Sequence, residues 1–248
     1  MTLEQFFAEN REVAIAFSGG VDSAYLLYAA TRYAARVKAY YVSTAFQPEF
    51  ELADARRLAN ELGADMLVLH VDVLSNSAVT ANPSDRCYHC KNTLFRQILR
   101  AAENDGFPVL LDGTNASDDA GDRPGMRALR ELSVRSPLRE CGLTKAEIRR
   151  LSKEAGLFTW DKPAYACLAT RIRTGEEITL QKLKQTEKAE GFLFGLGLRD
   201  FRVRMVSNTA KLELRETDLP LLLENREKIV TELRKDYDSV LLNLEVRK

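Results

Sequence analysis

The chain has 248 residues, with 36 basic and 36 acidic side chains, a formal net charge of zero and 45% hydrophobic residues. This length allows one large domain or two modest ones, and the composition is that of a globular protein rather than a disordered one. Balanced charge gives no overall field for nucleic acid, and no apolar stretch reaches the roughly 18 residues of a membrane span.

The N-terminal residues and the four cysteines of the chain indicate the cellular compartment in which the protein works. Residues 1–12 are polar and acidic, unlike a signal peptide. Four cysteines without an export signal favour a reducing environment, in which thiols more often bind metals or act in catalysis than form disulfides. We therefore expect a cytoplasmic protein that binds neither membrane nor nucleic acid.

Apolar runs alternate with helical segments over the first two-thirds of the chain. Strands are predicted at 13–17, 37–42, 66–71 and 109–113, and helices at 24–30, 49–62, 90–104 and 144–155. The last helix opens with a capping box of Thr144 and Glu147. Strands separated by helices predict an α/β fold with a doubly wound parallel sheet, in which ligands bind at the carboxyl ends of the strands.

The pattern changes after about residue 175. The sequence predicts an amphipathic helix, two half-exposed strands, a further helix and a last strand, at 179–193, 201–206, 211–215, 220–235 and 240–246. This block predicts a smaller C-terminal α+β domain. With a linker around 171–176, we expect domains at 1–174 and 175–248.

The motif SGGVDS, residues 18–23, lies between the first strand and the first helix. A strand, a tight turn and a helix N-terminus make an anion site, because free N–H groups and the positive end of the helix dipole converge there. Gly19 and Gly20 let the backbone approach a phosphate without a clashing Cβ atom. Ser18 and Ser23 can donate hydroxyl hydrogen bonds to it.

Asp22 is the unexpected member of this motif, since a carboxylate should repel a phosphate. It fits the site if it holds a divalent cation such as Mg²⁺ that bridges the phosphates. The motif lacks the GKS or GKT ending of the Walker P-loop, and it resembles the PP-loop of ATP pyrophosphatases, which cleave ATP between the α- and β-phosphates. The structural alternative is a glycine-rich turn with a Ser/Asp cap.

Two further strand ends carry candidate nucleotide-binding residues. Gly113, Thr114 and Asn115 supply a turn and polar groups after the strand at 109–113. Ser43 follows the second strand and is expected to meet the adenine and ribose, on topology alone. Of the basic residues near the motifs, namely Arg123, Arg127, Lys145, Lys162, Arg171 and Arg173, we favour Arg123, Lys162 and Arg171 because they adjoin other motif residues.

The cysteines point to the chemistry. Cys87 and Cys90 form a CxxC at the expected start of a helix, where the helix N-terminus and Lys91 favour the thiolate. Ordinary thiols are one interpretation, and a zinc site completed by Cys167 and a histidine is another, although His89 lies inside the CxxC itself. We favour a [4Fe–4S] cluster held by Cys87, Cys90 and Cys167, with one iron left open.

Taken together, these motifs are specific enough to indicate one protein family. The chain resembles the ATP-dependent sulfur transferases of nickel-pincer nucleotide cofactor biosynthesis, the LarE family, over nearly its whole length. The resemblance rests on SGGVDS, RCYHCK, LDGTN, RPG, CLATR and FRVR, at 18–23, 86–91, 111–115, 123–125, 167–171 and 201–204.

The resemblance implies a reaction in which MgATP adenylates a carboxylate of a pyridinium dicarboxylate mononucleotide and sulfur then displaces AMP. It implies catalytic roles for Asp22, Lys91, Cys167 and Arg171, a small-molecule substrate and a homo-oligomer. Some members sacrifice a single cysteine, which becomes dehydroalanine. The additional CxxC of this chain departs from that pattern and favours sulfur carried on the open iron, which leaves open whether Cys167 is consumed.

Three other functions stay open from the sequence. A tRNA-thiolating enzyme also uses a PP-loop and often three cysteines, although zero net charge and the lack of an RNA-binding module speak against it. An ammonia-dependent ligase shares the ATP half-reaction but needs no cysteines. A non-catalytic nucleotide-binding regulator would leave the spaced cysteines without a role.

Overall fold

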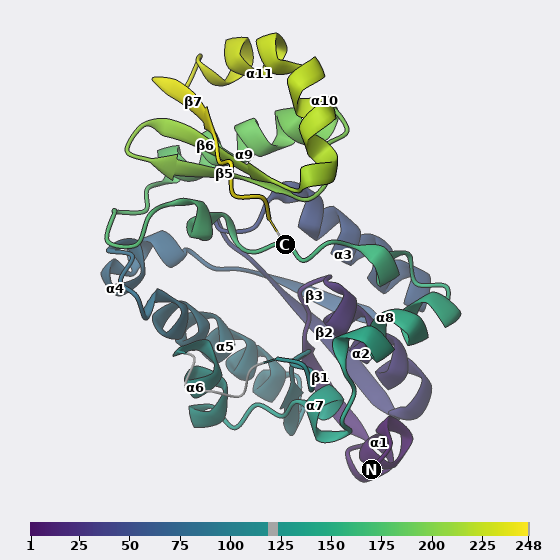
Figure 1. Ribbon diagram of the computed structural model, residues 1–248. Helices are drawn as coiled ribbons and strands as arrows, with labels where there is room; N and C mark the ends of the chain where they lie inside the picture. The colour runs from purple at the N-terminus through teal and green to yellow at the C-terminus, as the bar shows by residue number, and fades with distance from the viewer. Residues whose placement is uncertain (119–123, 248) are drawn as a thin grey trace. The chain divides into compact units, whose positions relative to one another are not determined.

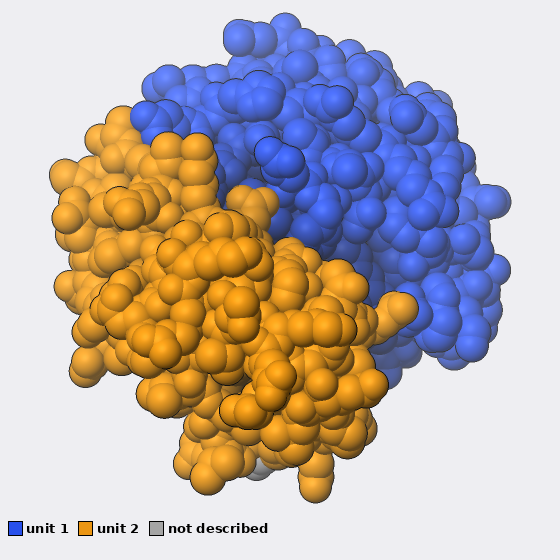
Figure 2. All heavy atoms as spheres, turned by 90° about the horizontal axis from the view of Figure 1, so that it is seen from above, with its two compact units in different colours: residues 1–73, 85–164 blue, residues 74–84, 165–248 orange. Residues whose placement is uncertain are grey.

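The computed structural model describes residues 1–118 and 124–247. The chain divides into two compact units, residues 1–73 with 85–164 and residues 74–84 with 165–248 (Figure 2). The segment 74–84 belongs with the second unit because it bonds to the chain after Arg171: the backbone N–H groups of Gly175 and Ile178 donate to the carbonyls of Asn82 and Thr80. The domain boundary at 174/175 stays a prediction about independent folding.

The first unit contains a four-stranded sheet in which all pairs are parallel. Its order is β3-β2-β1-β4, with bounds Asp65–His70, Arg36–Ser43, Glu12–Ala16 and Val109–Leu111. The chain leaves β1 toward β2 and β3 and returns to the other side of β1 at β4. The point where the strand order reverses therefore lies between the carboxyl ends of β1 and β4, which is where open α/β sheets bind ligands.

Helices cover both faces of this sheet, as the predicted doubly wound fold requires (Figure 1). Side chains alternate along β1: Val13 and Ile15 pack with α1, α2 and α8, whereas Ala14 packs with Ile98 of α5 on the other face. The helices of this unit are α1 (Leu3–Glu9), α2 (Val21–Tyr33), α3 (Glu49–Leu62), α5 (Arg86–Asn104), α6 (Pro124–Glu131), α7 (Pro137–Glu140), α8 (Lys145–Glu154) and the 3₁₀ turn η2 (Phe158–Asp161).

The second unit is the expected smaller α+β body, built on a mixed sheet of order β5-β6-β7. β5 and β6 are antiparallel and β7 is parallel to β6. Phe201, Val203 and Met205 point into a core with the helices, and the intervening arginines lie on the opposite face. Its elements are η3 (Leu168–Arg171), α9 (Leu180–Gly195), β5 (Phe201–Val206), β6 (Thr209–Leu214), η4 (Glu216–Asp218), α10 (Leu219–Glu224), α11 (Arg226–Leu233) and β7 (Ser239–Leu242), with α4 (Ser77–Thr80) from the inserted segment; η1 (Val73–Ser75) joins the two units.

Two sequence expectations for the second unit were wrong. The helix expected over 220–235 is two helices, since it breaks at Asn225, whose side-chain amide donates to the carbonyl of Leu221 at 3.0 Å and closes α10. The linker expected at 171–176 begins inside the unit, because Arg171 is 1% exposed and belongs to η3. Within the described residues, no helix is long and apolar enough to cross a membrane.

Candidate active site

The SGGVDS motif forms the predicted tight turn between β1 and α2. Gly19 has a φ of +73°, in the left-handed region that favours glycine, and Gly20 is the N-cap residue of α2. No side chain of the described residues caps this helix start, so its first N–H groups and its dipole remain available to an anion. The turn has the geometry of a phosphate cradle.

The two serines of the motif brace each other. The Ser18 and Ser23 hydroxyls lie 3.0 Å apart, and Ser23 Oγ also donates to the carbonyl of Gly20 at 3.2 Å. The backbone N–H of Ser18 donates to Ser23 Oγ at 3.3 Å. These bonds hold the turn closed around Gly19 and Gly20, so the serines preorganise the loop as well as offering hydroxyl groups to a ligand.

The loop after β4 lies directly against this turn. A Cβ atom placed on Gly113 would lie 2.9 Å from the backbone nitrogen of Ser23 and 3.3 Å from the carbonyl carbon of Asp22. Only glycine lets the two backbones approach so closely. Gly113, Thr114 and Asn115 are therefore brought to the turn as predicted, with Thr114 and Asn115 buried.

Buried polar contacts fix the loop after β4. Asp112 accepts hydrogen bonds from the Thr114 hydroxyl at 2.5 Å and from the Ser136 hydroxyl at 2.6 Å. The side-chain oxygen of Asn115 accepts from the backbone N–H of Ser117 at 2.8 Å. The Asn115 amide nitrogen is thereby directed at the PP-loop, where it donates to Asp22 Oδ1 at 3.3 Å.

Asp22 has a second partner that the sequence analysis passed over. Lys145 Nζ lies 2.5 Å from Asp22 Oδ2, and the two side chains are 34% and 22% exposed respectively. Lys145 is the first residue of α8, whose predicted capping box is present: the Thr144 side chain accepts from the backbone of Glu147, and the Glu147 carboxylate accepts from the backbone of Thr144. A capping box at the end of a site loop is the sequence signal that marks Lys145.

Lys162 contacts α3, whereas Ser43 ends β2. Lys162 Nζ pairs with Asp54 of α3 at 2.7 Å. The next residue of that helix, Ala55, would contact a Cβ atom on Gly19 at 3.2 Å, so the Lys162 side chain pairs with the helix that packs on the PP-loop. Ser43 is the last residue of β2, and its carbonyl accepts from the backbone of Val71 at 3.0 Å. Arg123 lies outside the described residues.

The CxxC lies at the start of α5, as predicted. Cys87 is exposed, Cys90 is partly buried, and an Arg86 Nη atom lies 3.9 Å from Cys87 Sγ. Residues three apart share one face of a helix, so both thiols are presented together. Lys91 packs its aliphatic chain and ammonium against Gly125 of α6, where an added Cβ would be 3.2–3.5 Å away.

Cys167 and Arg171 belong to the second unit. Arg171 donates to Glu190 through Nε at 2.7 Å and through Nη2 at 3.0 Å, and both side chains are almost fully buried. Burial lowers the pKa of Arg171, but the hydrogen bond and charge of Glu190 raise it by more, so the net shift is upward. Arg171 Nη1 also donates to the carbonyl of Ala166 at 2.8 Å, which ties down the loop carrying Cys167.

The face of the second sheet opposite its helices carries an arginine cluster that sequence reasoning missed. Burial, followed by the positive charges of Arg247, Arg171 and Arg204, lowers the pKa of Arg202. Arg204 bonds to Glu213 at 2.8 Å and to the carbonyl of Thr170 at 2.5 Å. Arg202 makes neither a hydrogen bond nor an ion pair with the residues described. The alternating FRVR pattern was the available signal, since it places two arginines on one face.

The predicted metal ligands are only partly brought together. Nowhere in residues 1–118 and 124–247 do three or more His, Cys, Asp or Glu side chains gather as a metal site. Cys87 and Cys90 lie in the first unit and Cys167 in the second, so the cluster on these three thiolates stays a prediction. Mg²⁺ is usually held by one or two carboxylates plus substrate phosphates, and a single carboxylate beside the phosphate cradle fits that requirement.

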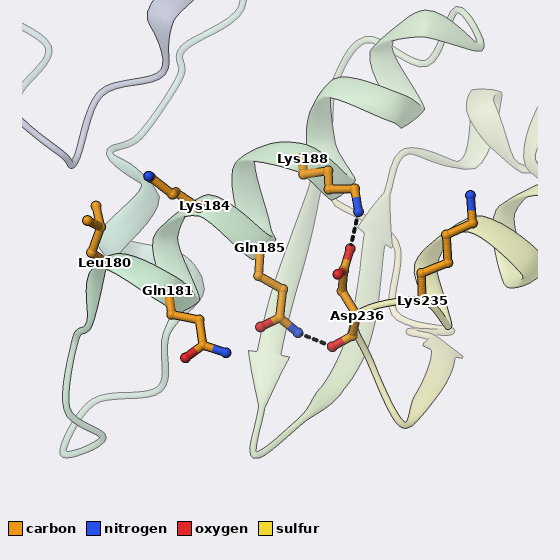
Figure 3. A pocket seen from close by; sticks show the side chains of 7 residues that line it. All are labelled: Leu180, Gln181, Lys184, Gln185, Lys188, Lys235 and Asp236. Atoms are coloured by element: carbon orange, nitrogen blue, oxygen red, sulfur yellow. Dashed lines mark hydrogen bonds and ion pairs between the residues drawn. The ribbon is translucent and has the colours of Figure 1, made fainter.

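A separate hollow of about 630 Å³ lies along α9 (Figure 3). Lys188 pairs there with Asp236 at 2.6 Å, and Gln185 donates to the Asp236 carbonyl. The predicted site residues are not among its lining, which consists of Leu180, Gln181, Lys184, Gln185, Lys188, Lys235 and Asp236. Leu183 and Ala189 of the same helix are buried, so the hollow lies on the outer, polar side of α9, beside the residues that follow α11.

Comparison with known proteins agrees with this geometry. Residues 4–119 match the asparagine synthase family, whose members share the PP-loop, so the chain contains a PP-loop ATP-using domain. It is 40% identical to an uncharacterized protein of Synechocystis over 86% of this chain and 80% of that protein. It is 26% identical to the tRNA-specific 2-thiouridylase MnmA of Thermotoga petrophila, over 59% of this chain and 52% of that enzyme.

One characterised relative gives the particular family. The chain is 33% identical to the pyridinium-3,5-bisthiocarboxylic acid mononucleotide synthase of Lactiplantibacillus plantarum, over 87% of this chain and 79% of that enzyme. The protein belongs to this family, the LarE family of ATP-dependent sulfur transferases, and is an enzyme. The family and the α/β fold expected from the motifs are confirmed.

Proposed function

We propose that this enzyme uses ATP to adenylate a carboxylate of a pyridinium dicarboxylate mononucleotide, releases pyrophosphate, and then replaces AMP with sulfur to give a thiocarboxylate for nickel-pincer cofactor synthesis. The observation that carries the proposal is the convergence of the PP-loop, the Gly113–Asn115 loop and Asp22 at the point where the strand order reverses. The relative from Lactiplantibacillus plantarum supports this choice of substrate.

The first half-reaction belongs to the PP-loop. A carboxylate is a poor electrophile, and adenylation gives it a good leaving group. The N–H groups at the start of α2 and the Ser18 and Ser23 hydroxyls bind the β- and γ-phosphates and stabilise the charge that develops on pyrophosphate. Asp22 holds Mg²⁺, which when bound neutralises part of that charge. Ser43 and Lys162 are the candidates for the rest of the nucleotide.

In the second half-reaction, the replacement of AMP by sulfur, Cys167 and the arginine cluster are the acting groups. Arg202 has positive neighbours and bonds to no carboxylate among the residues described, so it suits the phosphate of a mononucleotide. Arg204 links that cluster to Thr170, three residues from Cys167. Arg171 is a positioning residue: through Glu190 and Ala166 it fixes the loop that carries the thiol.

ATP cleavage is tested by identifying the products. With ATP, Mg²⁺ and the pyridinium dicarboxylate mononucleotide, the wild-type protein should form AMP and pyrophosphate, and Asp22→Ala should abolish this. Asp65→Ala, which removes an exposed carboxylate paired with Lys38, is the matched control and should keep the activity. Formation of ADP and phosphate would contradict the proposal, and AMP release that depends on tRNA rather than on the mononucleotide would favour tRNA thiolation.

The source of sulfur needs a separate test. A cluster on Cys87, Cys90 and Cys167 predicts that each Cys→Ala variant loses iron and sulfide after anaerobic reconstitution, whereas Cys141→Ala does not. Intact-protein mass spectrometry after turnover distinguishes the two chemistries. Loss of one sulfur and two hydrogens at Cys167 would mean that this cysteine is sacrificed, and an unchanged mass with added sulfide would mean that it acts as a ligand.

A further inference from the structure

Among the described residues, the Asp22 carboxylate accepts from two donors. Lys145 Nζ lies 2.5 Å from Oδ2, and Asn115 Nδ2 lies 3.3 Å from Oδ1. A carboxylate that binds a divalent cation must give it an oxygen lone pair, and an ammonium at 2.5 Å occupies the same position electrostatically. Lys145 and the cation of the proposed ATP site therefore compete for Asp22.

The backbone of Lys145 is held in place, whereas its side chain is long and has several rotatable bonds. Its N–H donates to Ser117 Oγ at 3.0 Å, in the same loop that lines the site, and the capping box of Thr144 and Glu147 fixes the start of α8. The side chain is one-third exposed and ends in a point charge with three rotatable donors. An ammonium can therefore move between anions near the PP-loop without any change in the fold.

A lysine is an unfavourable choice for the first position of a helix, because the dipole is positive there. A purely structural link between α2 and α8 does not require it, since these helices already share an apolar core that includes Leu27 and Ile148. Residues that contradict local preferences, such as a lysine at the positive end of a helix dipole, are typical of functional sites. The position calls for an anion larger in charge than one carboxylate, and pyrophosphate is such an anion.

We propose that Lys145 is a phosphate ligand that exchanges partners. Without nucleotide its ammonium neutralises Asp22; when ATP binds, it moves to the β- and γ-phosphates and leaves Asp22 to the divalent cation. The inference rests on the proposed function of the PP-loop. It makes nucleotide and metal binding cooperative, because each displaces the other's competitor.

The test measures Mn²⁺ binding by electron paramagnetic resonance, with and without α,β-methylene-ATP, in wild type, Lys145→Met and Lys145→Arg. Wild type should bind Mn²⁺ at least tenfold more tightly with the analogue than without it. Lys145→Met should bind Mn²⁺ alone more tightly than wild type and should bind the analogue about tenfold more weakly, because a charge-assisted phosphate contact is lost. Lys145→Arg should restore much of the nucleotide affinity.

Lys38→Met is the control, since Lys38 also pairs with carboxylates, those of Asp65 and Asp105. It should change neither Mn²⁺ nor nucleotide binding. A folded Lys145→Met protein that binds Mn²⁺ alone and the analogue as wild type does would overturn the exchange. That result is separate from failure of the proposed function, which would appear as the absence of AMP and pyrophosphate formation by wild type.

Discussion

Gly113→Ala is the sharpest perturbation of the contact between the PP-loop and the loop after β4. The added methyl group would lie 2.9 Å from the backbone nitrogen of Ser23, 3.2 Å from its Cα atom and 3.3 Å from the carbonyl carbon of Asp22. Gly113 is not among the glycines with positive φ, so alanine can adopt its backbone conformation. The effect is therefore steric, and all three contacts are with backbone that cannot rotate away.

The size of the effect of Gly113→Ala follows from the overlap between the added methyl group and the PP-loop backbone. Ordinary carbon contacts begin near 3.5 Å, so the two loops must separate by about half an ångström. Overpacking of this kind costs about 1–3 kcal/mol, and each kcal/mol lowers Tm by roughly 2–4 °C in a chain of this size. The larger effect should fall on catalysis, because a displacement approaching 1 Å at a reacting group can cost about 100-fold in rate.

The assay compares thermal unfolding and ATP-dependent pyrophosphate release in wild type, Gly113→Ala and Gly191→Ala. Gly191 lies within α9, and an added Cβ atom meets nothing within 4 Å among the described residues. Gly191→Ala should stabilise the protein by roughly 0.5–1 kcal/mol and leave pyrophosphate release unchanged. If Gly113→Ala matched Gly191→Ala in both measurements, the close approach of the two loops would be refuted.

Two further predictions concern titratable groups. Burial, with a smaller contribution from Glu140, raises the pKa of the Cys141 thiol, so at pH 8 iodoacetamide should modify exposed Cys87 well before Cys141, as peptide mass mapping would show; equal rates would contradict this. Hydrogen bonds from the Thr144 hydroxyl and backbone lower the pKa of Glu147 below 4.5. Its stabilisation is complete above pH 4.5 and is lost as pH falls through the lowered value, so urea unfolding of Glu147→Gln should lack that part of the acid dependence.

The sequence predicted the features that depend on local chemistry. The glycines at 19 and 20, the capping box at Thr144 and the alternation over 201–206 each specify a turn, a helix start or a strand through neighbouring residues. The parallel sheet followed from the spacing of strands and helices. The break at Asn225 was missed because apolar residues lie on both sides of it, at 221–223 and 229–230, and asparagine disfavours a helix interior only weakly.

The partners of charged residues were not predictable in this way. Lys145 was passed over in favour of Lys162 and Arg171 because those two adjoin motif residues in the sequence. In the structure Lys145 contacts Asp22 across 123 positions, and Lys162 contacts Asp54 across 108. Such ion pairs depend on where the fold brings helix ends and strand ends together. Neighbouring residues in the sequence do not predict that arrangement.

The buried pair of Arg171 and Glu190 allows a final prediction about the Cys167 loop. Glu190 also accepts from the backbone of Val203 at 2.9 Å and from the Tyr165 hydroxyl. Glu190→Gln keeps the shape but leaves a buried guanidinium without its counter-charge, which costs about 3–5 kcal/mol.

The Glu213→Gln variant is the matched comparison, because its pair with Arg204 is more exposed and should cost about 1 kcal/mol or less. Urea unfolding measures both. Since Arg171 also holds the carbonyl of Ala166, loosening the pair should free the loop and speed alkylation of Cys167 in Glu190→Gln but not in Glu213→Gln. Equal stability and equal alkylation in the two variants would show that Arg171 does not position the cysteine, and its place in the CLATR motif would then need a direct role in the chemistry.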